Sequence, residues 1–234
     1  MMRVLFNADD FGLTKGVTDG IIRAHTEGVV QSTTMMMNGH TVPYAVRQAK
    51  NTPTLASGIH LVLTWGKPIS DKVPGLLGND GHFKYNNSFA DMEAPNPAEV
   101  EKEWRAQIEA FLKTGLSLHH IDSHHHVHGW EPLKNTVSKL AAEYQVPVRY
   151  VDSLQEYPEL LLTEQLWLGF YGDGVDETIF DNLKKLQTDS VEVMTHPAVV
   201  DKRLMEVSSY NEKRKKELEI LSRLTFPDWV ERLV

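Results

Sequence analysis

The sequence predicts an α/β fold whose parallel sheet closes into a barrel. Strand-like and helix-like segments alternate along most of the 234 residues, and this alternation is typical of parallel sheets connected by helices. Polar clusters follow the carboxyl ends of at least four strands, where parallel barrels build their active sites. No Gly-x-Gly-x-x-Gly follows the first strand, so the main signature of a dinucleotide-binding sheet is missing. We therefore favour the barrel over an open, doubly wound sheet.

The first half of the chain supplies three expected strands. The opening segment is a short apolar run that ends in Asn-Ala-Asp-Asp, and the segment after it places apolar residues at helical spacing. The expected elements are a strand at Arg3–Asn7, a helix at Gly16–Glu27, a strand at Gln31–Met37, a helix at Val42–Lys50, a strand at Ser57–Leu63 and a helix at Pro97–Lys113.

The second half continues the alternation with shorter segments. The expected elements are strands at His119–Asp122, Val146–Val151 and Ser190–Thr195, and helices at Pro132–Tyr144, Asp176–Gln187 and Asn211–Leu224. The stretch between Val151 and Asp176 has no clear pattern.

We expect residues 1–234 to form one domain with a long loop insertion at about 64–97. This insertion is rich in Gly, Asn, Asp and Pro and shows little periodicity, and such a loop in a compact domain is usually a lid or a binding loop. A chain of this length buries a sizeable core without cross-links. The sequence has no cysteine, which excludes disulfides, zinc–thiolate sites, iron–sulfur clusters and thiol nucleophiles.

The charge balance argues against nucleic-acid and membrane partners. The chain has 24 Lys and Arg against 32 Asp and Glu, a net charge of −8, and its one basic cluster is Lys213–Lys216. No apolar run is long enough for a transmembrane helix. The first residues turn polar at Asn7, too early for a signal peptide. The expected location is the cytoplasm.

Histidines gather after the fourth expected strand. Six of the eleven histidines lie between His119 and His128, close to Asp122. On an extended segment His124 and His126 would share a face and His125 would point away. The alternative is a hydrogen-bonded histidine patch without a ligand, but the position directly after a strand favours a metal or catalytic site.

Two adjacent carboxylates, Asp9 and Asp10, follow the first strand. Burying both requires a cation or hydrogen bonds, whereas a turn or a helix cap would be the simpler explanation. His60 and His196 also end apolar strands, and each alone would be most simply a core histidine. Together, one Asp and two His at one end of a barrel form a nitrogen and oxygen site suited to Zn²⁺, Co²⁺, Ni²⁺, Mn²⁺ or Mg²⁺.

Several motifs resemble those of the YdjC-like family of carbohydrate deacetylases, of which chitooligosaccharide deacetylase is the best-known member. They are Asn-Ala-Asp-Asp-Phe-Gly-Leu-Thr-Lys-Gly from Asn7, Ser-Thr-Thr-Met-Met-Met-Asn-Gly from Ser32, Gly-Ile-His-Leu from Gly58, His-Ile-Asp-Ser-His-His-His-Val-His from His120 and Glu-Val-Met-Thr-His-Pro from Glu192. The resemblance covers the chain from Asn7 to about Leu221. The segment Thr225–Val234 departs from it, because it lacks the expected Ile- and Leu-rich closing strand.

The resemblance implies a deformed (β/α) barrel, similar to a TIM barrel, with about seven strands. It implies a divalent cation, most often Mg²⁺, and removal of acetyl groups from N-acetylated sugars or oligosaccharides. By position, Asp10, His60 and His124 would be the metal ligands, with His126 as the alternative to His124. Family members are commonly homodimers, which implies the same assembly here.

The remaining roles follow from the same comparison of positions. Asp9 would be the general base, and His196 matches the family's late His-Pro position and would be the general acid, kept protonated by neighbouring carboxylates. Independently of the resemblance, Arg149 lies at an expected strand end and is a candidate for orienting Asp9, with a surface charge as the alternative. Trp130 and Tyr171 lie in or near expected loops, where their faces could stack on a sugar ring, and His126 is a third candidate for substrate binding.

Three other classes of protein fit the same residues. A barrel phosphoesterase could use the His-x-His pairs, although such enzymes generally carry that motif on the first strand. A non-haem iron oxygenase also uses two His and one carboxylate. A non-catalytic metal- or sugar-binding protein would fit if Asp9 and His196 pointed away from the metal.

Overall fold

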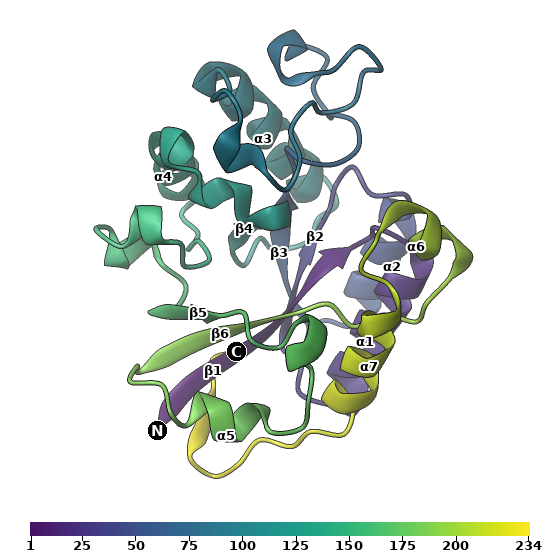
Figure 1. Cartoon of the computed structure of the whole chain (residues 1–234), viewed down its shortest axis with the longest axis vertical. Coiled ribbons are helices and arrows are strands. Elements are labelled where there is room, and N and C mark those ends of the chain that lie inside the picture. Colours follow the sequence, from purple (N-terminus) through teal and green to yellow (C-terminus); the bar gives the residue numbers. More distant parts are fainter.

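A parallel sheet of seven strands forms the centre of the computed structural model, which describes residues 1–234. The hydrogen-bonded order is β4-β3-β2-β1-β6-β5, and β7 pairs with β1. The strands are β1 (Met2–Phe11), β2 (Ser32–Met35), β3 (Ala56–Leu61), β4 (Ile121–Ser123), β5 (Gln165–Trp167), β6 (Ser190–Thr195) and β7 (Val230–Arg232). Figure 1 shows the sheet curling, with β4 and β5 at its two edges.

Strand β1 is the centre of this sheet. Every residue from Val4 to Phe11 is buried, as expected for a strand whose two faces are both covered. One edge of β1 pairs with β6. The other edge pairs with β7 near its start and with β2 near its end, with a shift in register between Ala8 and Phe11. Asp9 and Asp10 lie within that irregularity.

The sheet is a half-barrel, which confirms the predicted class of a deformed (β/α) barrel. Between β4 and β5 the wall continues only as single bridges, from Ile121 to Val148 and from Val148 to Leu161. The strand expected at Val146–Val151 is therefore wrong beyond Val148. Pro147 has no amide hydrogen to extend the ladder, and Arg149 turns its side chain towards buried carboxylates.

Two groups of helices cover the sheet. The helices are α1 (Lys15–Glu27), α2 (Val42–Asn51), α3 (Pro97–Leu112), α4 (Lys134–Tyr144), α5 (Ile179–Leu183), α6 (Lys202–Val207) and α7 (Glu212–Leu221). Helices α1, α2, α6 and α7 gather on one side, and α3 lies beside α4 on another (Figure 1). One cluster of 48 buried hydrophobic residues connects both groups to the sheet. None of the helices has both the length and the apolar character needed to cross a bilayer.

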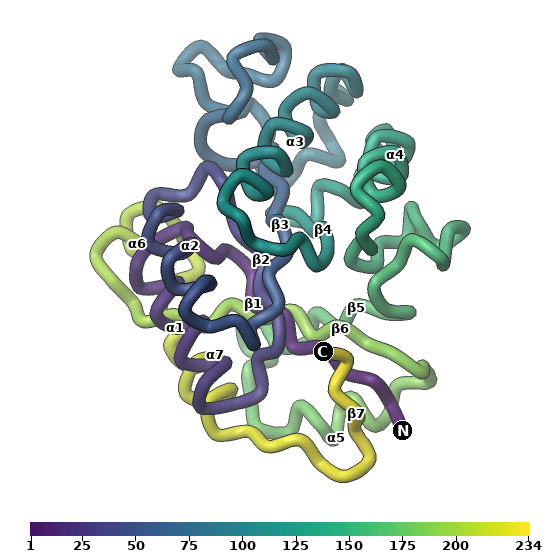
Figure 2. Tube along the Cα trace, turned by 180° about the vertical axis from the view of Figure 1, so that it is seen from behind, coloured from purple at the N-terminus to yellow at the C-terminus, as the bar shows by residue number.

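The C-terminal segment supplies a strand that its sequence pattern does not indicate. Val230–Arg232 pairs with Met2–Val4, and the side-chain amide of Gln31 donates a hydrogen bond to the carbonyl of Val234. Figure 2 shows β7 running beside the start of β1, so that the two ends of the chain lie close together. Thr225–Val234 thus supplies a short, largely exposed strand although it lacks an Ile- and Leu-rich pattern.

The insertion at 64–97 is packed rather than structureless. It contains two short 3₁₀ turns, Pro74–Leu76 and Phe89–Asp91, and an antiparallel bridge between Leu77 and Phe83. The buried side chain of Glu103, on α3, accepts hydrogen bonds from two backbone amides of the insertion. The buried residues within the insertion are Thr64, Val73, Leu76, Phe83, Tyr85 and Pro95. Part of the insertion thus belongs to the hydrophobic core.

Candidate active site

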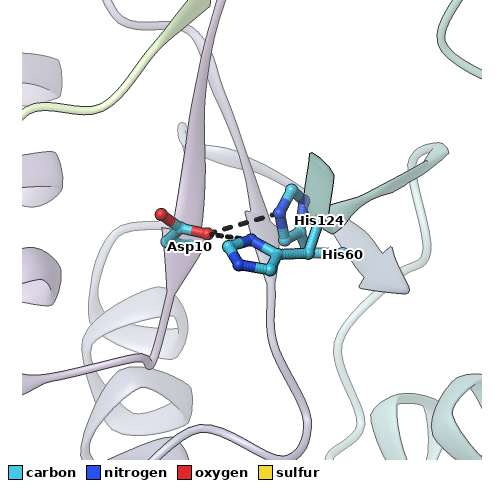
Figure 3. A group of neighbouring side chains, drawn as sticks. All are labelled: Asp10, His60 and His124. Carbon is cyan, nitrogen blue, oxygen red and sulfur yellow. Dashed lines mark hydrogen bonds and ion pairs between the residues drawn. The ribbon is translucent and has the colours of Figure 1, made fainter. Parts of the chain in front are cut away.

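Three side chains converge where β1 and β3 end and where the chain leaves β4. Asp10 Oδ1 lies 3.3 Å from His60 Nε2 and 3.2 Å from His124 Nδ1, as Figure 3 shows. One ligand atom from each residue lies within 4.8 Å of the others. The structure therefore brings together the three residues that the sequence comparison assigns to a metal.

A backbone turn at Asp10 separates the two adjacent carboxylates. Asp10 has a φ of 69°, in the left-handed region that Asp tolerates better than most residues. In this arrangement Asp9 faces Arg149, whereas Asp10 faces the two histidines and Arg214. The two carboxylates consequently have different direct partners.

Asp9 is held by a bidentate ion pair. Its Oδ1 lies 2.6 Å from Arg149 Nη2 and its Oδ2 lies 2.7 Å from Arg149 Nη1, the fork geometry that suits an arginine and a carboxylate. Asn7 Nδ2 also donates to Asp9 Oδ1 at 2.9 Å. Burial raises the pKa of Asp9, but the Arg149 guanidinium outweighs it and holds the pKa well below its usual range. Asp9 is therefore an ionised and oriented carboxylate at neutral pH.

The same guanidinium connects Asp9 to the metal-ligand group. Arg149 Nη2 lies 2.8 Å from Asp122 Oδ2 and 2.7 Å from Glu192 Oε1. The other oxygen of Asp122 accepts a hydrogen bond from His60 Nδ1 at 2.7 Å. A carboxylate on one nitrogen of a histidine orients the ring and directs the other nitrogen to a metal. Here His60 Nε2 is directed at Asp10.

The electrostatics of His60 fit a cation at this position. Burial lowers the pKa of His60, but Asp122 and Asp10 outweigh burial and raise it to about 10. The negative surroundings thus hold a proton on the ring, and a divalent cation between Nε2 and Asp10 would replace the proton on that nitrogen. One carboxylate and two imidazoles form a suitable donor set for several divalent metals.

Arg214 is a site residue that sequence reasoning missed. Its Nη2 donates to Asp10 Oδ2 at 2.6 Å, and its Nε donates to the carbonyl of Tyr210 at 2.7 Å. We expected it within a solvated basic cluster, Lys213–Lys216. The sequence feature that could have indicated its burial is its spacing from two leucines, because Arg214 shares a face of α7 with the buried Leu218 and Leu221.

His196 lies at the site, but in a different protonation state from the one expected. Its Nε2 is 3.9 Å from Asp9 Oδ2, and its backbone amide donates to the Glu217 carboxylate. Burial, and then the positive charge of Arg214, lower the pKa of His196 to about 3. His196 is therefore neutral at pH 7, so the expectation that carboxylates keep it protonated is wrong.

The three consecutive histidines do not form an extended segment. His125 and His126 have φ values of 55° and 56° within a turn that spans His124–Gly129. All three side chains line the same cavity, so the predicted separation of His125 from its neighbours is wrong. His125 Nδ1 lies 3.0 Å from Thr64 Oγ1, and His126 Nδ1 is buried without a hydrogen-bond partner.

A cavity of about 530 Å³ opens over these residues. Tyr171 is stacked on Tyr210 at its wall, with ring centroids 4.1 Å apart, and the edge of His196 meets both rings. The insertion contributes Trp65, Asn86 and Asn87. The expected substrate residues His126 and Tyr171 line this cavity.

Trp130, the third expected substrate residue, lies elsewhere. It is 8% exposed and packs against Tyr85 and Phe89. It lines a neighbouring cavity of about 510 Å³.

Comparisons with known proteins identify the family of the chain. The family model described as YdjC-like protein matches residues 3–232. A carbohydrate deacetylase of Oceanobacillus iheyensis is 57% identical over 230 residues, which is 98% of this chain and 100% of that protein. A carbohydrate deacetylase of Brevibacillus brevis is 42% identical over 236 residues, covering 98% of this chain and 94% of that protein.

A solved structure is also similar over most of the chain. The protein comes from Enterococcus faecalis V583 and carries the name of a cellobiose-phosphate cleavage protein. It aligns with a TM-score of 0.88 at 36% identity, covering 94% of this chain and 90% of that one. With a family model that spans nearly every residue and relatives this similar, the chain belongs to the YdjC-like family.

Proposed function

We propose that this protein is a metal-dependent carbohydrate deacetylase that releases acetate from the acetamido group of N-acetylated sugars. The observation that carries the proposal is the separation of Asp9 from Asp10. Asp10 lies in a group able to hold a cation, and Asp9 lies beside that group as an ionised carboxylate on Arg149. The names of the relatives, carbohydrate deacetylases, support the same reaction.

Asp10, His60 and His124 would hold the cation. When bound, a divalent cation would polarise the acetyl carbonyl of the substrate and lower the pKa of a water molecule. Mg²⁺ is the metal that the family resemblance favours, while Zn²⁺, Mn²⁺, Co²⁺ and Ni²⁺ also accept nitrogen and oxygen ligands.

Asp9 would act as the general base. Its low pKa keeps the carboxylate free of a proton at neutral pH, and Arg149 fixes the direction of both oxygens. General-base catalysis by a well-placed group contributes about 10²–10⁴ in rate. Arg149 is a positioning residue, since it acts through Asp9.

His196 would carry the proton to the leaving nitrogen. Because it is neutral at rest, it would receive the proton that Asp9 takes from the attacking water through one bridging water molecule, since 3.9 Å separates Asp9 Oδ2 from His196 Nε2. Its low pKa then makes it a strong acid towards the departing amine. The products balance: the hydroxyl of water goes to the acetyl group and its proton goes to the sugar nitrogen.

The walls of the cavity suit a sugar. The Tyr171 ring, stacked on Tyr210 and 46% exposed, offers an apolar face for the C–H side of a pyranose ring. His126 also lines this cavity. The homodimer and the cytoplasmic location remain predictions.

Acetate release from N-acetylglucosamine and from its N-acetylated disaccharide tests the proposal. We expect activity that a chelator abolishes and that Mg²⁺, or another of the five metals, restores. Phosphate release from phosphate esters without acetate release would favour the phosphoesterase. Oxygen-dependent turnover with Fe²⁺ would favour the oxygenase, and sugar or metal binding without turnover would favour a binding protein.

A further inference from the structure

The imidazole of His196 has no hydrogen bond that fixes the direction of its ring. Its Nδ1 is buried and has no partner, and its Nε2 lies 3.9 Å from Asp9 Oδ2, beyond hydrogen-bond distance. In many active sites a histidine is oriented by a hydrogen bond on the ring nitrogen that does not react. The direction of this ring therefore depends on the backbone of His196 and on the side chains packed against it.

Helix α7 holds the backbone of this segment at two points. The amide of His196 donates to Glu217 Oε2, and the amide of Ala198 donates to the carbonyl of Arg214 at 3.2 Å. Arg214 and Glu217 are three residues apart and so lie on the same face of the helix. One face of α7 thus contacts Asp10, through the Arg214 side chain, and the backbone of His196, through Glu217.

The other oxygen of Glu217 holds the pair of stacked tyrosines in the cavity wall. Tyr210 Oη donates to Glu217 Oε1 at 2.5 Å and accepts a hydrogen bond from the Gly172 amide at 3.1 Å. Gly172 directly follows Tyr171, whose ring stacks on Tyr210 with an interplanar angle of 18°. The Tyr210 hydroxyl therefore connects the loop that carries Tyr171 to α7.

Glu217 contacts His196 twice, directly at its backbone and through the tyrosines at its ring. The ring centroid of His196 lies 5.6 Å from that of Tyr171 and 5.8 Å from that of Tyr210. Glu217 is fully buried, and burial of a carboxyl group costs free energy unless hydrogen bonds compensate it. Both of its side-chain hydrogen bonds go to residues that line the active-site cavity.

We propose that Glu217 is a positioning residue that sets the direction of the His196 ring and the place of the Tyr171–Tyr210 stack beside it. Its bond to the His196 amide acts on proton delivery and so on kcat. Its bond to the Tyr210 hydroxyl acts on the surface that the sugar contacts and so on KM. The roles of His196 as the acid and of Tyr171 as the sugar-binding surface rest on the proposed function.

Tyr210→Phe removes the hydroxyl and keeps the ring. We expect KM for the N-acetylated disaccharide to rise about fivefold or more and kcat to stay within about twofold, because the His196 amide keeps Glu217. Tyr44→Phe is the matched control, since the Tyr44 hydroxyl also donates to a carboxylate, that of Asp19, at 2.5 Å. Tyr44 lies on α2, outside the cavity, so its variant should leave both constants unchanged.

Two substitutions of Glu217 separate positioning from stability. Glu217→Met removes both hydrogen bonds with a side chain of similar length, and kcat per folded molecule should fall about tenfold or more while KM rises as in Tyr210→Phe. Glu217→Gln keeps an oxygen for the His196 amide and should restore kcat to within about threefold of the wild type. A merely structural role would lower the amount of folded protein, and with it the apparent kcat, at unchanged KM.

Amide hydrogen exchange tests both bonds without catalysis. Exchange at His196 should be faster than in the wild type in Glu217→Met but not in Tyr210→Phe. Exchange at Gly172 should be faster in both variants, because both remove a bond that holds the Tyr210 hydroxyl or the hydroxyl itself. A misfolded variant is recognised by fast exchange throughout the sheet, and Tyr210→Phe then carries the test.

The outcomes distinguish this proposal from the proposed function. Wild-type protein that releases no acetate contradicts the proposed function, and exchange then decides whether Glu217 holds the two segments. Unchanged exchange at His196 and Gly172 in Glu217→Met contradicts the positioning role. Active wild-type protein whose KM is unchanged in Tyr210→Phe, or whose kcat falls equally in Glu217→Gln and Glu217→Met, contradicts it as well.

Discussion

Asp9 and Asp10 are adjacent in the chain and differ in every contact that matters to the reaction. Asp10 contacts His60, His124 and Arg214, whereas Asp9 contacts Arg149. We expect Asp10→Asn to weaken metal binding strongly. Asp9→Asn should keep the metal and lose about 10²-fold or more in kcat, since it removes the base but not a ligand. Metal titration and acetate release measure the two effects.

The matched comparison makes this prediction specific. Both variants remove one negative charge from the same turn, and in Asp9→Asn the guanidinium of Arg149 still has Asp122 and Glu192. If Asp9→Asn loses the metal and Asp10→Asn retains it, the assigned roles are reversed.

The candidate site was predictable from the sequence as far as residue types and strand ends allow. Asp10 and His60 lie at the carboxyl ends of β1 and β3, and His124 directly follows β4, so their convergence followed from the fold. The protonation of His196 did not follow, because it depends on burial and on Arg214, eighteen residues later in the sequence. Arg214 itself lies in a run of basic residues, and such runs are mostly solvated.

At the scale of elements, the left-handed backbone conformation in the turn at His124–Gly129 can be tested by substitution. His125 is exposed and has a φ of 55°, a conformation that disfavours residues with a Cβ by roughly 1–2 kcal/mol relative to glycine. Among variants that all lack the imidazole, His125→Gly should be more stable to urea than His125→Ala by about 1 kcal/mol. His125→Val should be the least stable, because its side chain is β-branched.

Metal affinity provides the control for this series. His124→Ala should lower it, since His124 Nδ1 faces Asp10, whereas all three His125 variants should bind metal as the wild type does. Equal stability of the glycine and alanine variants would contradict a left-handed backbone at His125.

The insertion separates into a part that lines the cavity and a part that belongs to the core. Asn86 and Asn87 are exposed and line the active-site cavity, so the double variant Asn86→Ala, Asn87→Ala should raise KM several-fold at unchanged Tm. Leu76 is fully buried, and Leu76→Ala should lower the free energy of unfolding by about 2–5 kcal/mol. Steady-state kinetics and thermal unfolding of the two variants measure this division. A fall in Tm for the asparagine variant would place that stretch in the core as well.

Elements with a strong apolar pattern were predictable, and short ones were not. The expected strand at Ser190–Thr195 has the bounds of β6, and the expected helix at Val42–Lys50 differs from α2 by one residue. Strands β5 and β7 have three residues each and none that is buried, so neither produces a hydrophobic signal. Their positions depend on hydrogen bonds of β5 to β6 and of β7 to β1. A three-residue sequence does not indicate which distant strand it will pair with.

At the scale of the whole molecule, buried carboxyl groups set the pH dependence of stability. Burial raises the pKa of Glu192 to about 7 and that of Glu217 to about 8. Between pH 4.5 and 8 these two groups bind more protons in the folded state than in the unfolded state, so their contribution to the free energy of unfolding falls as pH rises. Buried histidines act in the opposite direction below pH 6.5, because burial lowers the pKa of His120, His128 and His196. Asp9 and Asp10, whose pKa values lie well below the usual range, also lose their stabilising contribution at low pH. Stability should therefore be greatest near neutral pH.

Glu217→Gln tests this prediction. The amide keeps the shape of the side chain and cannot ionise, so the free energy of unfolding of the variant relative to the wild type should rise by about 1 kcal/mol or more between pH 5 and pH 8. Urea unfolding with a chelator present measures it without the proton release that metal binding adds. An unchanged slope in the variant would show that Glu217 is ionised throughout.

The central position of β1 also bears on how the protein is made. Asp9 pairs with Arg149, which lies 140 residues later in the chain, and Asp10 pairs with Arg214, which lies 204 residues later. Contacts this distant in sequence form late, because the chain between them must be synthesised and ordered first. A nascent polypeptide that ends before α7 contains both carboxylates. It lacks β7, which pairs with β1, and it lacks Arg214, whose guanidinium neutralises Asp10. The ion pair between Asp10 and Arg214 thus forms only when translation is nearly complete.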